Sequence, residues 1–288
     1  YGFYNNTRNL PDRRDLNRSF PGSKNGSLAA RVARLFAEEI VDKAAYGIDL
    51  HTGSNHRANL PHIRANLDNP ECNRLAKAFG APVVINANLR DGSLRQYALD
   101  KGLSMLLYEA GEGLRFDSLS IRGGVRGILN VLRALNMLPK SSKKAASKVV
   151  EARSSQWVRA PQAGLMRMVV PLGARVMQGQ TIGKMSDSVG DNETAITAPV
   201  TGIVIGRNNL PVVNEGDALF DAALRAGADC PNLPFVEIGS YCGRSTVWFG
   251  EAARLSNTVL HAVDHHGGSE ENQPGWEWHD QTLVDPAT

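Results

Sequence analysis

The stretch DLHTGSNHRANLPHIRA (residues 49–65) decides how the chain is interpreted. The apolar run AYGIDL (45–50) leads into it, so His51 stands where a buried strand is expected to end. Open α/β sheets place their sites at the carboxyl ends of strands, and imidazole is a common zinc ligand. His51 is therefore a candidate metal ligand at the rim of a sheet. The alternative is one polar residue in a solvated loop, because His56 and His62 follow at spacings that match no helical ligand pair.

Helical and strand-like patterns alternate on both sides of this stretch. Helical spacing occurs at 27–44, 74–80 and 123–138, and short apolar runs typical of strands occur at 46–52, 81–88 and 102–111. Ser27 is a plausible N-cap, and Gly80 is placed to end its helix. The alternation predicts an α/β domain over residues 1–138, with a mainly parallel sheet and flanking helices.

Three further segments follow this domain. Residues 139–150 are rich in Lys, Ser and Ala and are interpreted as a linker. Residues 151–220 contain an internal repeat: APQAG (160–164) recurs as APVTG (198–202), and VMQGQTIG (176–183) recurs as VNEGDALF (213–220). Residues 221–288 have a different composition and form the last predicted segment.

The repeat predicts a small β-barrel or sandwich that resembles the biotinyl/lipoyl-carrier fold. Carrier domains present a lysine on the turn between their halves, and the corresponding turn here, SDSVGDNETA (186–195), has none. Lys184 is close to this turn but is expected in a strand. We therefore expect a structural cap or lid instead of a swinging arm.

Composition excludes several classes of protein. The chain has 288 residues, 42% of them hydrophobic, which suffices for a large core and about two domains. The formal net charge of +3 gives no reason to expect a nucleic-acid partner. Three cysteines form no disulfide framework and favour a reducing, cytoplasmic compartment. The sequence contains no run of about 18 apolar residues, so no membrane span is predicted.

Two polar features are candidates for chemistry. The loop RNLPDRRDLNRSFPG (8–22) holds Arg8, Arg13, Arg14, Asn17 and Arg18. Guanidinium groups bind carboxylates bidentately, so this loop suits an anionic substrate, although a solvated basic loop is the alternative. Glu109, in LLYEAGEG, follows a strand and could act as a general base; the alternative is an ordinary strand-end carboxylate.

Taken together, DLNRSFPG, DLHTG and EAGEG, in this order, resemble the succinylglutamate desuccinylase/aspartoacylase family over about residues 1–220. These proteins are zinc-dependent amidohydrolases related to the zinc carboxypeptidases. The resemblance implies that His51 is a zinc ligand and that Glu109 is the general base. It further implies that Arg8 polarises the scissile carbonyl and stabilises its oxyanion.

The same resemblance implies that Asn17 and Arg18 grip a carboxylate of a small-molecule substrate, with Arg64 also facing the cleft. The family carries its first two zinc ligands in a His-x-x-Glu motif upstream of DLNR, and no such motif precedes Arg8. One histidine cannot complete a zinc site, because such sites use three or four protein ligands. Since the chain opens on Tyr1, we expect that it is truncated at its N-terminus and that its activity is impaired.

The segment VEIGSYCGRST, followed by HAVDHH, resembles the first β-α-β unit of class I S-adenosylmethionine-dependent methyltransferases. Gly239 and Gly243 would permit close approach of the cofactor, and Glu237 and Asp264 would be the acidic residues that bind it. The resemblance covers about residues 230–270 and implies a partial domain.

Three hypotheses follow. The chain is a zinc-dependent deacylase of an N-acyl amino acid or similar small amide, a methyltransferase with an accessory N-terminal part, or a non-catalytic fragment. Motif coverage ranks the deacylase first.

Overall fold

A computed structural model describes most of the first 225 residues and two short strands beyond them. The described ranges are 1–54, 56–87, 92–140, 149–187, 189–190, 192–225, 235–238 and 260–263. The chain divides into two compact units, Tyr1–Ala226 and Gly227–Thr288. Each unit is described by itself.

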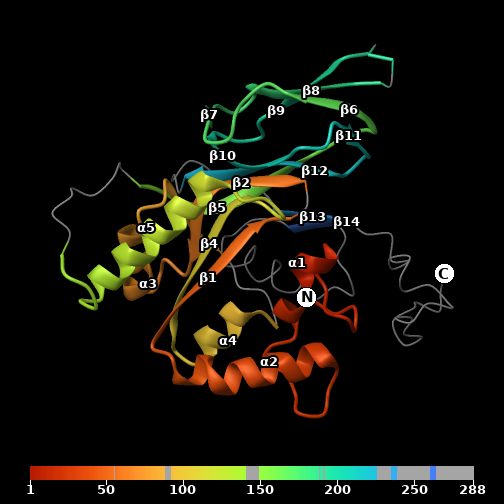
Figure 1. The fold of residues 1–288 in the computed structure, drawn as a ribbon. Helices are drawn as coiled ribbons and strands as arrows, with labels where there is room; N and C mark the ends of the chain where they lie inside the picture. The colour runs from red at the N-terminus through yellow and green to blue at the C-terminus, as the bar shows by residue number, and fades with distance from the viewer. Residues whose placement is uncertain are drawn as a thin grey trace. The chain divides into compact units, whose positions relative to one another are not determined.

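The first unit is built on an eight-stranded sheet (Figure 1). In sheet order its strands are β1 (Tyr46–Gly53), β4 (Ser104–Glu112), β2 (Arg57–Ala65), β3 (Val83–Asn86), β5 (Val150–Arg159), β12 (Ala218–Arg225), β10 (Gly202–Asn208) and β7 (Arg175–Val176). The predicted strands at 46–52, 81–88 and 102–111 are confirmed as β1, β3 and β4. The α/β class is therefore confirmed.

The prediction of a mainly parallel sheet holds only in part. The pairs β1–β4, β2–β3 and β3–β5 are parallel, whereas β2 runs antiparallel to β4 and the strands beyond β5 are antiparallel. The reason is the short connection between β1 and β2. A parallel crossover needs a dozen or more residues, and residues 54–56 are too few, so β2 returns in the opposite direction.

Strand β2 is not among the strands that the sequence predicts. It contains Pro61, and proline cannot donate to a ladder. The structure accommodates Pro61 at a register shift between Asn59 and His62, where β2 changes its pairing with β4. Regular pairing with β3 begins only at His62. The second half of the opening stretch is thus a central strand and not a loop.

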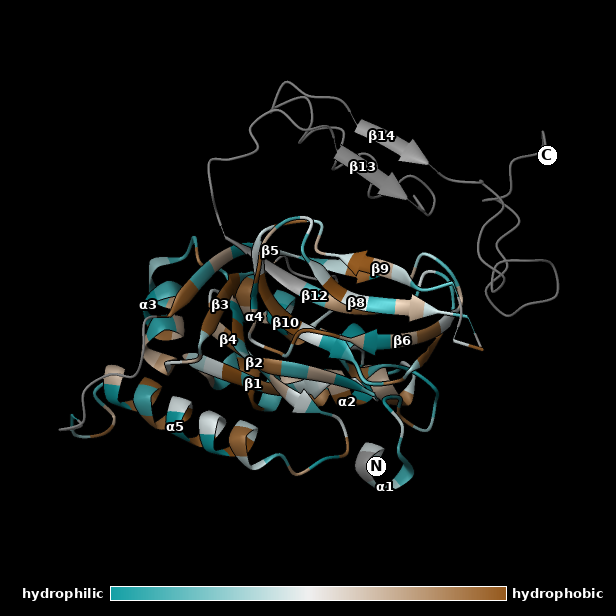
Figure 2. Cartoon of the chain, turned by 90° about the horizontal axis from the view of Figure 1, so that it is seen from above, coloured by the Kyte–Doolittle hydropathy of each residue, from teal (hydrophilic) through white to brown (hydrophobic). Residues whose placement is uncertain are grey.

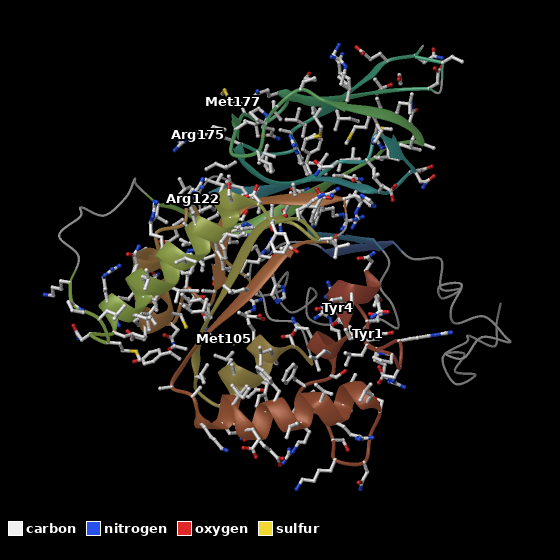
Figure 3. The ribbon with its side chains drawn as sticks, in the orientation of Figure 1. Tyr1, Tyr4, Met105, Arg122, Arg175 and Met177 are labelled. Carbon is white, nitrogen blue, oxygen red and sulfur yellow. The ribbon has the colours of Figure 1, made fainter. Side chains whose placement is uncertain are left out.

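Helices cover both faces of the α/β part of the sheet. Helices α3 (Pro70–Phe79) and α5 (Ser118–Ala134) pack on one face, and α2 (Leu28–Glu39) and α4 (Leu94–Asp100) lie on the other (Figure 1). In Figure 2, α5 carries both apolar and polar residues along its length, as expected of a helix with one buried side. Met105 of β4 packs with the α2 and α4 side, beside α4 in Figure 3.

Side chains cap these helices as their sequences predict. The Ser27 hydroxyl accepts a hydrogen bond from the Ala30 amide, and Gly80 ends α3 with a left-handed φ of 82°. Helix α2 ends at Glu39, and the rest of the predicted 27–44 segment includes a short 3₁₀ turn, Val41–Lys43. Helix α5 begins at Ser118 because Asp117 caps it, five residues before the predicted start at 123.

The repeat forms a small β sandwich. A four-stranded sheet in the order β11 (Val212–Val213), β6 (Gly164–Met168), β8 (Thr181–Ser186), β9 (Thr194–Thr197) packs over the β12–β10–β7 end of the large sheet. Its core contains residues at equivalent positions of the two repeats: Ala160 corresponds to Ala198, Met166 to Val204, and Ile182 to Leu219. Lys184 lies in β8, as expected.

The two repeats exchange edges. Strand β6 of the first repeat pairs with β11 of the second, and β10 of the second pairs with β7 of the first. The turns follow the same symmetry, because Ala198 bonds to Gly179 and Gln180 just as Ala160 bonds to Gly216 and Asp217. The large sheet then continues from this sandwich into the α/β part through β12–β5 and β10–β2.

In the second unit the structure describes two parallel strands, β13 (Phe235–Ile238) and β14 (Leu260–Val263). Glu237 lies in β13, opposite Ala262. Gly239, Gly243, Asp264 and most of the predicted linker lie outside the described residues.

Candidate active site

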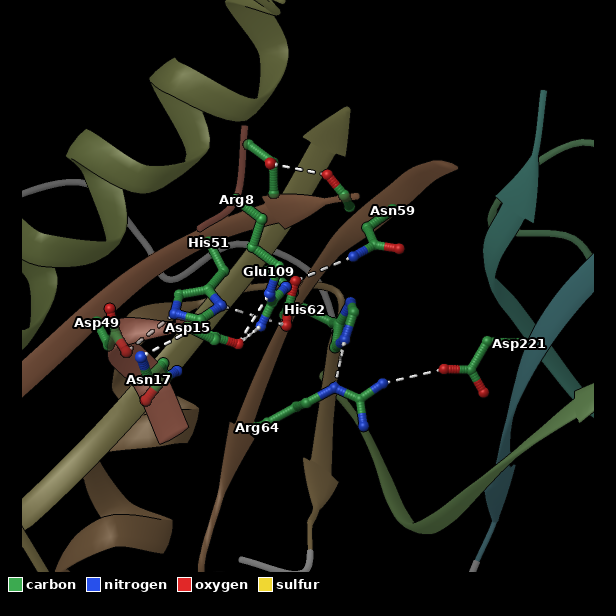
Figure 4. A network of polar contacts seen from close by, with 12 residues as sticks. Arg8, Asp15, Asn17, Asp49, His51, Asn59, His62, Arg64, Glu109 and Asp221 are labelled. Atoms are coloured by element: carbon green, nitrogen blue, oxygen red, sulfur yellow. Dashed lines mark hydrogen bonds and ion pairs between the residues drawn. The ribbon is translucent and has the colours of Figure 1, made fainter. Parts of the chain in front are cut away.

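The candidate site lies on one face of β1, β4 and β2. His51 of β1 is opposite Glu109 of β4, and Glu109 is opposite His62 of β2. Side chains two residues apart on a strand share a face, which adds Asp49 and Arg64 to the same cluster (Figure 4). The alternate residues of these strands, such as Ile63 and Tyr108, face the core under α3 and α5. Strand alternation therefore places these polar side chains on the face opposite the α3–α5 core.

His51 lies between two carboxylates. Its Nε2 is 3.0 Å from Oδ2 of Asp49, and its Nδ1 is 3.9 Å from Oε1 of Glu109. Burial alone would lower the pKa of His51, but the Asp49 hydrogen bond and the charges of Asp49 and Glu109 outweigh burial and raise the pKa above its ordinary 6.5. The neighbouring carboxylates thus favour the protonated form of the His51 imidazole beside Glu109.

Glu109 is the more deeply placed carboxylate, with a side chain 16% exposed. Its Oε2 accepts a hydrogen bond of 3.0 Å from Nδ2 of Asn59. Burial raises the pKa of Glu109, and the charges of His51 and Arg64 with the Asn59 hydrogen bond offset only part of that shift. A buried carboxyl with a raised pKa and a fixed orientation suits proton transfer near neutral pH.

A second group of contacts continues from this cluster along β2. Nδ1 of His62 is 2.7 Å from the Leu60 carbonyl oxygen, and Nε of Arg64 donates to Nε2 of His62 at 3.2 Å. Nη2 of Arg64 donates to Oδ2 of Asp221 at 3.0 Å. Asp221 belongs to β12, so the sandwich contributes to this network.

The N-terminal loop approaches the same place. Arg8 pairs with Asp15 through Nε at 2.9 Å, and the charge of Arg8 acts against the raised pKa of His51. The Asn17 amide oxygen accepts from the Leu94 backbone amide at the start of α4. Figure 4 places Arg8, Asp15 and Asn17 beside His51.

The structure brings together most, not all, of the predicted site residues. Arg8, Asn17, His51, Arg64 and Glu109 lie in neighbouring groups of polar contacts in one region of the structure (Figure 4). Arg18 is exposed, and its Nη1 donates to the backbone carbonyl of Asn17.

Sequence reasoning missed Asp15, Asp49, Asn59, His62 and Asp221 as members of the network. Strand alternation could have found Asp49, which stands two residues before His51 in DLHTG. Asp221 could not have been found, because its place depends on pairing between β12 and β5, far from the motif in the chain.

The described residues do not by themselves fit a zinc ion. Throughout the part of the chain that the structure describes, no three His, Cys, Asp or Glu side chains gather in a way that could hold a metal. His51 is engaged by Asp49 through the same Nε2 that a metal would need on that side. The arrangement offers a carboxylate base, an imidazole and guanidinium groups, and no step through a metal follows from it.

Comparison with known proteins places these residues in a family context. Residues 1–135 match the family model "Succinylglutamate desuccinylase/Aspartoacylase catalytic domain". The curated N-alpha-acetyl-L-2,4-diaminobutyric acid deacetylase of Halomonas elongata is 29% identical over 217 residues, which are 71% of this chain and 64% of that protein. The chain therefore spans less than two thirds of the length of this relative.

Solved structures share the fold. The ectoine utilization protein EutE (DoeB) of Ruegeria pomeroyi, in a product-bound structure, superposes with a TM-score of 0.69 and 24% identity over 77% of this chain and 71% of that one. A succinylglutamate desuccinylase/aspartoacylase of Rhodobacter sphaeroides gives a TM-score of 0.67 with 25% identity over 78% and 72% of the two chains.

A weak match to a methyltransferase domain covers residues 236–286. No helix among the described residues is long and apolar enough to cross a membrane. The motifs, the fold and the family match over residues 1–135 agree, and this part of the chain is similar to the succinylglutamate desuccinylase/aspartoacylase catalytic-domain family.

Proposed function

We propose that the chain is of the amidohydrolase type and acts on an N-acyl amino acid or a similar small amide that carries a carboxylate. The observation that carries this proposal is the pairing of Glu109 with His51 across β1 and β4, with Asn59 holding the carboxylate from β2. The deacetylase activity in the name of the Halomonas elongata relative supports the reaction class.

In this proposal Glu109 accepts a proton from water as the water oxygen attacks the amide carbonyl carbon. The carbon–nitrogen bond then breaks, and Glu109 returns the proton to the leaving amine. Arg8 stabilises the negative charge on the carbonyl oxygen. Asn17 and Arg18 bind the substrate carboxylate, and Arg18 can do so through the N–H donors other than the one that contacts the Asn17 carbonyl.

Zinc dependence is part of the same proposal. His51 would supply one ligand of that ion. The described residues provide no complete ligand set, and the roles of Glu109, Arg8 and Asn59 in this proposal rest on their own contacts.

The test is hydrolysis of a panel of N-acetyl amino acids by the wild-type protein, Glu109→Gln and Glu112→Gln. Glu112 is a matched control because it lies on the same strand and contacts Asn209, outside the network. Glu109→Gln should lower kcat/KM by about 10²–10⁴-fold, the usual contribution of a general base. Undiminished turnover in this variant would exclude Glu109 as the base. Zinc content that is equal in wild-type protein and His51→Ala would exclude His51 as a ligand.

A second activity is supported by the weak methyltransferase match and by the parallel pairing of β13 with β14. It predicts that S-adenosylmethionine binds in calorimetric titration and that Glu237→Ala weakens this binding. If neither hydrolysis nor cofactor binding is detected, the non-catalytic fragment remains as the interpretation.

A further inference from the structure

The buried histidine of β2 has no part in the proposed chemistry. His62 is 1% exposed, yet both of its ring nitrogens are engaged. A backbone carbonyl can only accept a hydrogen bond, so Nδ1 carries the hydrogen that Leu60 receives. The Arg64 Nε–H can only donate, so Nε2 must be unprotonated. His62 is therefore a neutral imidazole with a fixed tautomer.

The environment keeps His62 in this state. Burial, together with the charge of Arg64, lowers the pKa of His62 to about 3. A protonated ring could not accept from Arg64, and the two cations would repel each other. The ring therefore remains an acceptor throughout the neutral pH range.

Asp221 holds the same guanidinium from the opposite side. Its side chain is 3% exposed, and its Oδ2 receives the Nη2 hydrogen of Arg64. Burial raises the pKa of Asp221, while Arg64 and a weaker interaction with Ser155 lower it. The buried Oδ1 has no hydrogen-bond partner among the described residues, so Arg64 is the principal compensation for this carboxylate.

Close backbone packing fixes this geometry. Gly206 of β10 is opposite Asn59 of β2, and a Cβ at Gly206 would lie 3.2 Å from the Cβ of Asp221 and 3.3 Å from Oδ1 of Asn59. The sandwich therefore approaches closely enough to set both the Asn59–Glu109 contact and the Asp221–Arg64 contact.

Arg64 has donors left over. Its guanidinium carries five N–H donors, and the described contacts use Nε and one hydrogen of Nη2. Among the residues that the structure describes, Nη1 has no hydrogen-bond partner, and the side chain is 24% exposed. The positive charge of Arg64 interacts electrostatically with Glu109 and acts to lower the pKa of that carboxyl.

We propose that Arg64 is a carboxylate-binding residue of the site, and that His62 and Asp221 are positioning residues that aim its Nη1 edge at a substrate anion next to Glu109. This inference rests on the proposed function for the identity of the substrate. It makes the sandwich, through Asp221, a structural component of substrate recognition.

Two probes that differ only in the carboxylate test the inference without requiring turnover. Binding of N-acetyl-L-alanine and of N-acetyl-L-alaninamide is measured by titration calorimetry. The wild-type protein should prefer the acid by about tenfold or more, as expected for one charge-assisted hydrogen bond. Arg64→Lys should remove most of this preference, and Arg167→Lys, an exposed arginine of the sandwich paired with Glu193, should keep it.

The positioning residues are tested by a spectroscopic signature and by conservative rescue. The slowly exchanging Nε–H signal of Arg64 in a ¹H–¹⁵N spectrum, assigned by its loss in Arg64→Lys, should disappear in His62→Leu. It should persist in His62→Gln, whose amide oxygen can still accept. Asp221→Asn, which keeps an acceptor but removes the charge, should reduce the preference for the acid while the protein stays folded.

The outcomes separate this inference from the proposed function. An Arg64-dependent preference in a protein that hydrolyses nothing would support the inference and count against the deacylase. Hydrolysis in which Arg64→Lys leaves the preference for the acid, KM and kcat unchanged would overturn the inference and leave the deacylase standing. Loss of the preference in Arg18→Lys, together with its full retention in Arg64→Lys, would also overturn it. If His62→Leu does not fold, His62→Gln and Asp221→Asn still decide the positioning roles.

Discussion

His51 illustrates how a single side chain is defined by neighbours on two strands. Asp49 is its partner along β1, and Glu109 is its partner across the sheet. The first follows from the alternation of a strand, whereas the second follows from the parallel register with β4. Removing one partner at a time should separate their contributions.

Asp49→Asn should lower the pKa of His51 in metal-free protein. The variant loses the charge of Asp49 that raises this pKa, and burial, which lowers it, remains. The measurement is a histidine NMR titration, with His62 as an internal control, because its pKa of about 3 keeps it silent over the neutral range. A His51 pKa that does not move would show that Asp49 is not its partner.

The same shift predicts how stability depends on pH. Because the folded-state pKa of His51 is raised, its stabilising contribution is complete below the ordinary pKa of 6.5 and is lost as the pH rises through the folded-state value. Asp49→Asn should therefore destabilise the protein more at about pH 5 than at about pH 9 in denaturant unfolding. An equal loss at both pH values would contradict the linkage.

At the scale of elements, hydrophobic periodicity and helix caps predict several helices and strands of the α/β part. The helical repeat with Ser27 predicts α2, and the apolar runs predict β1, β3 and β4. Strand β2 could not be predicted in this way, because Pro61 argues against a central strand unless the register shift around it is known. That shift depends on β4, about 50 residues away, and leaves no local trace in the sequence.

The contact between α3 and α5 gives a prediction at this scale. A Cβ at Gly127 would lie 2.0 Å from the ring of Phe79, which is 2% exposed and packs on Tyr108 with ring centroids 5.0 Å apart. Gly127→Ala should lower the free energy of unfolding by about 1–3 kcal/mol, despite the better helix propensity of alanine. Chemical denaturation measures this loss.

A double variant and a neighbouring substitution provide the controls. Phe79→Leu removes the ring, so the combined variant should be less destabilised than the sum of the two single ones. The exposed neighbour Arg126→Ala should change stability by no more than about 0.5 kcal/mol. Additive effects of Gly127→Ala and Phe79→Leu would show that the two positions do not compete for space.

At the scale of the whole first unit, the site depends on pairings that join distant segments. His51 and Glu109 could be predicted together, because both stand near strand ends in recognisable motifs. Asn59 and Asp221 could not, since β10 and β12 reach β2 and β5 only in the folded chain. The predicted division into an α/β domain and a repeat domain describes the sequence, while the hydrogen-bonded sheet crosses that boundary without interruption.

This continuity predicts that β2 and β12 open together. Hydrogen exchange followed by mass spectrometry should give peptides from 57–65 and 218–225 similar free energies of opening, close to that of global unfolding, because β5 and β10 connect the two strands. If residues 218–225 exchange through an opening of much lower free energy than residues 57–65, the sandwich opens as an independent unit. Asp221 could not then hold Arg64 in all folded molecules.

The exchanged edges of the repeat limit how such a sandwich can come into being. Each half contributes one short strand to the other. Strand β11 of the second half pairs with β6 of the first, and β7 of the first half pairs with β10 of the second. A lone half would leave those edges open to the nearest copy of itself. A chain of half this length would therefore be expected to complete its sheets only by pairing with a second identical chain, whereas here one molecule supplies both partners.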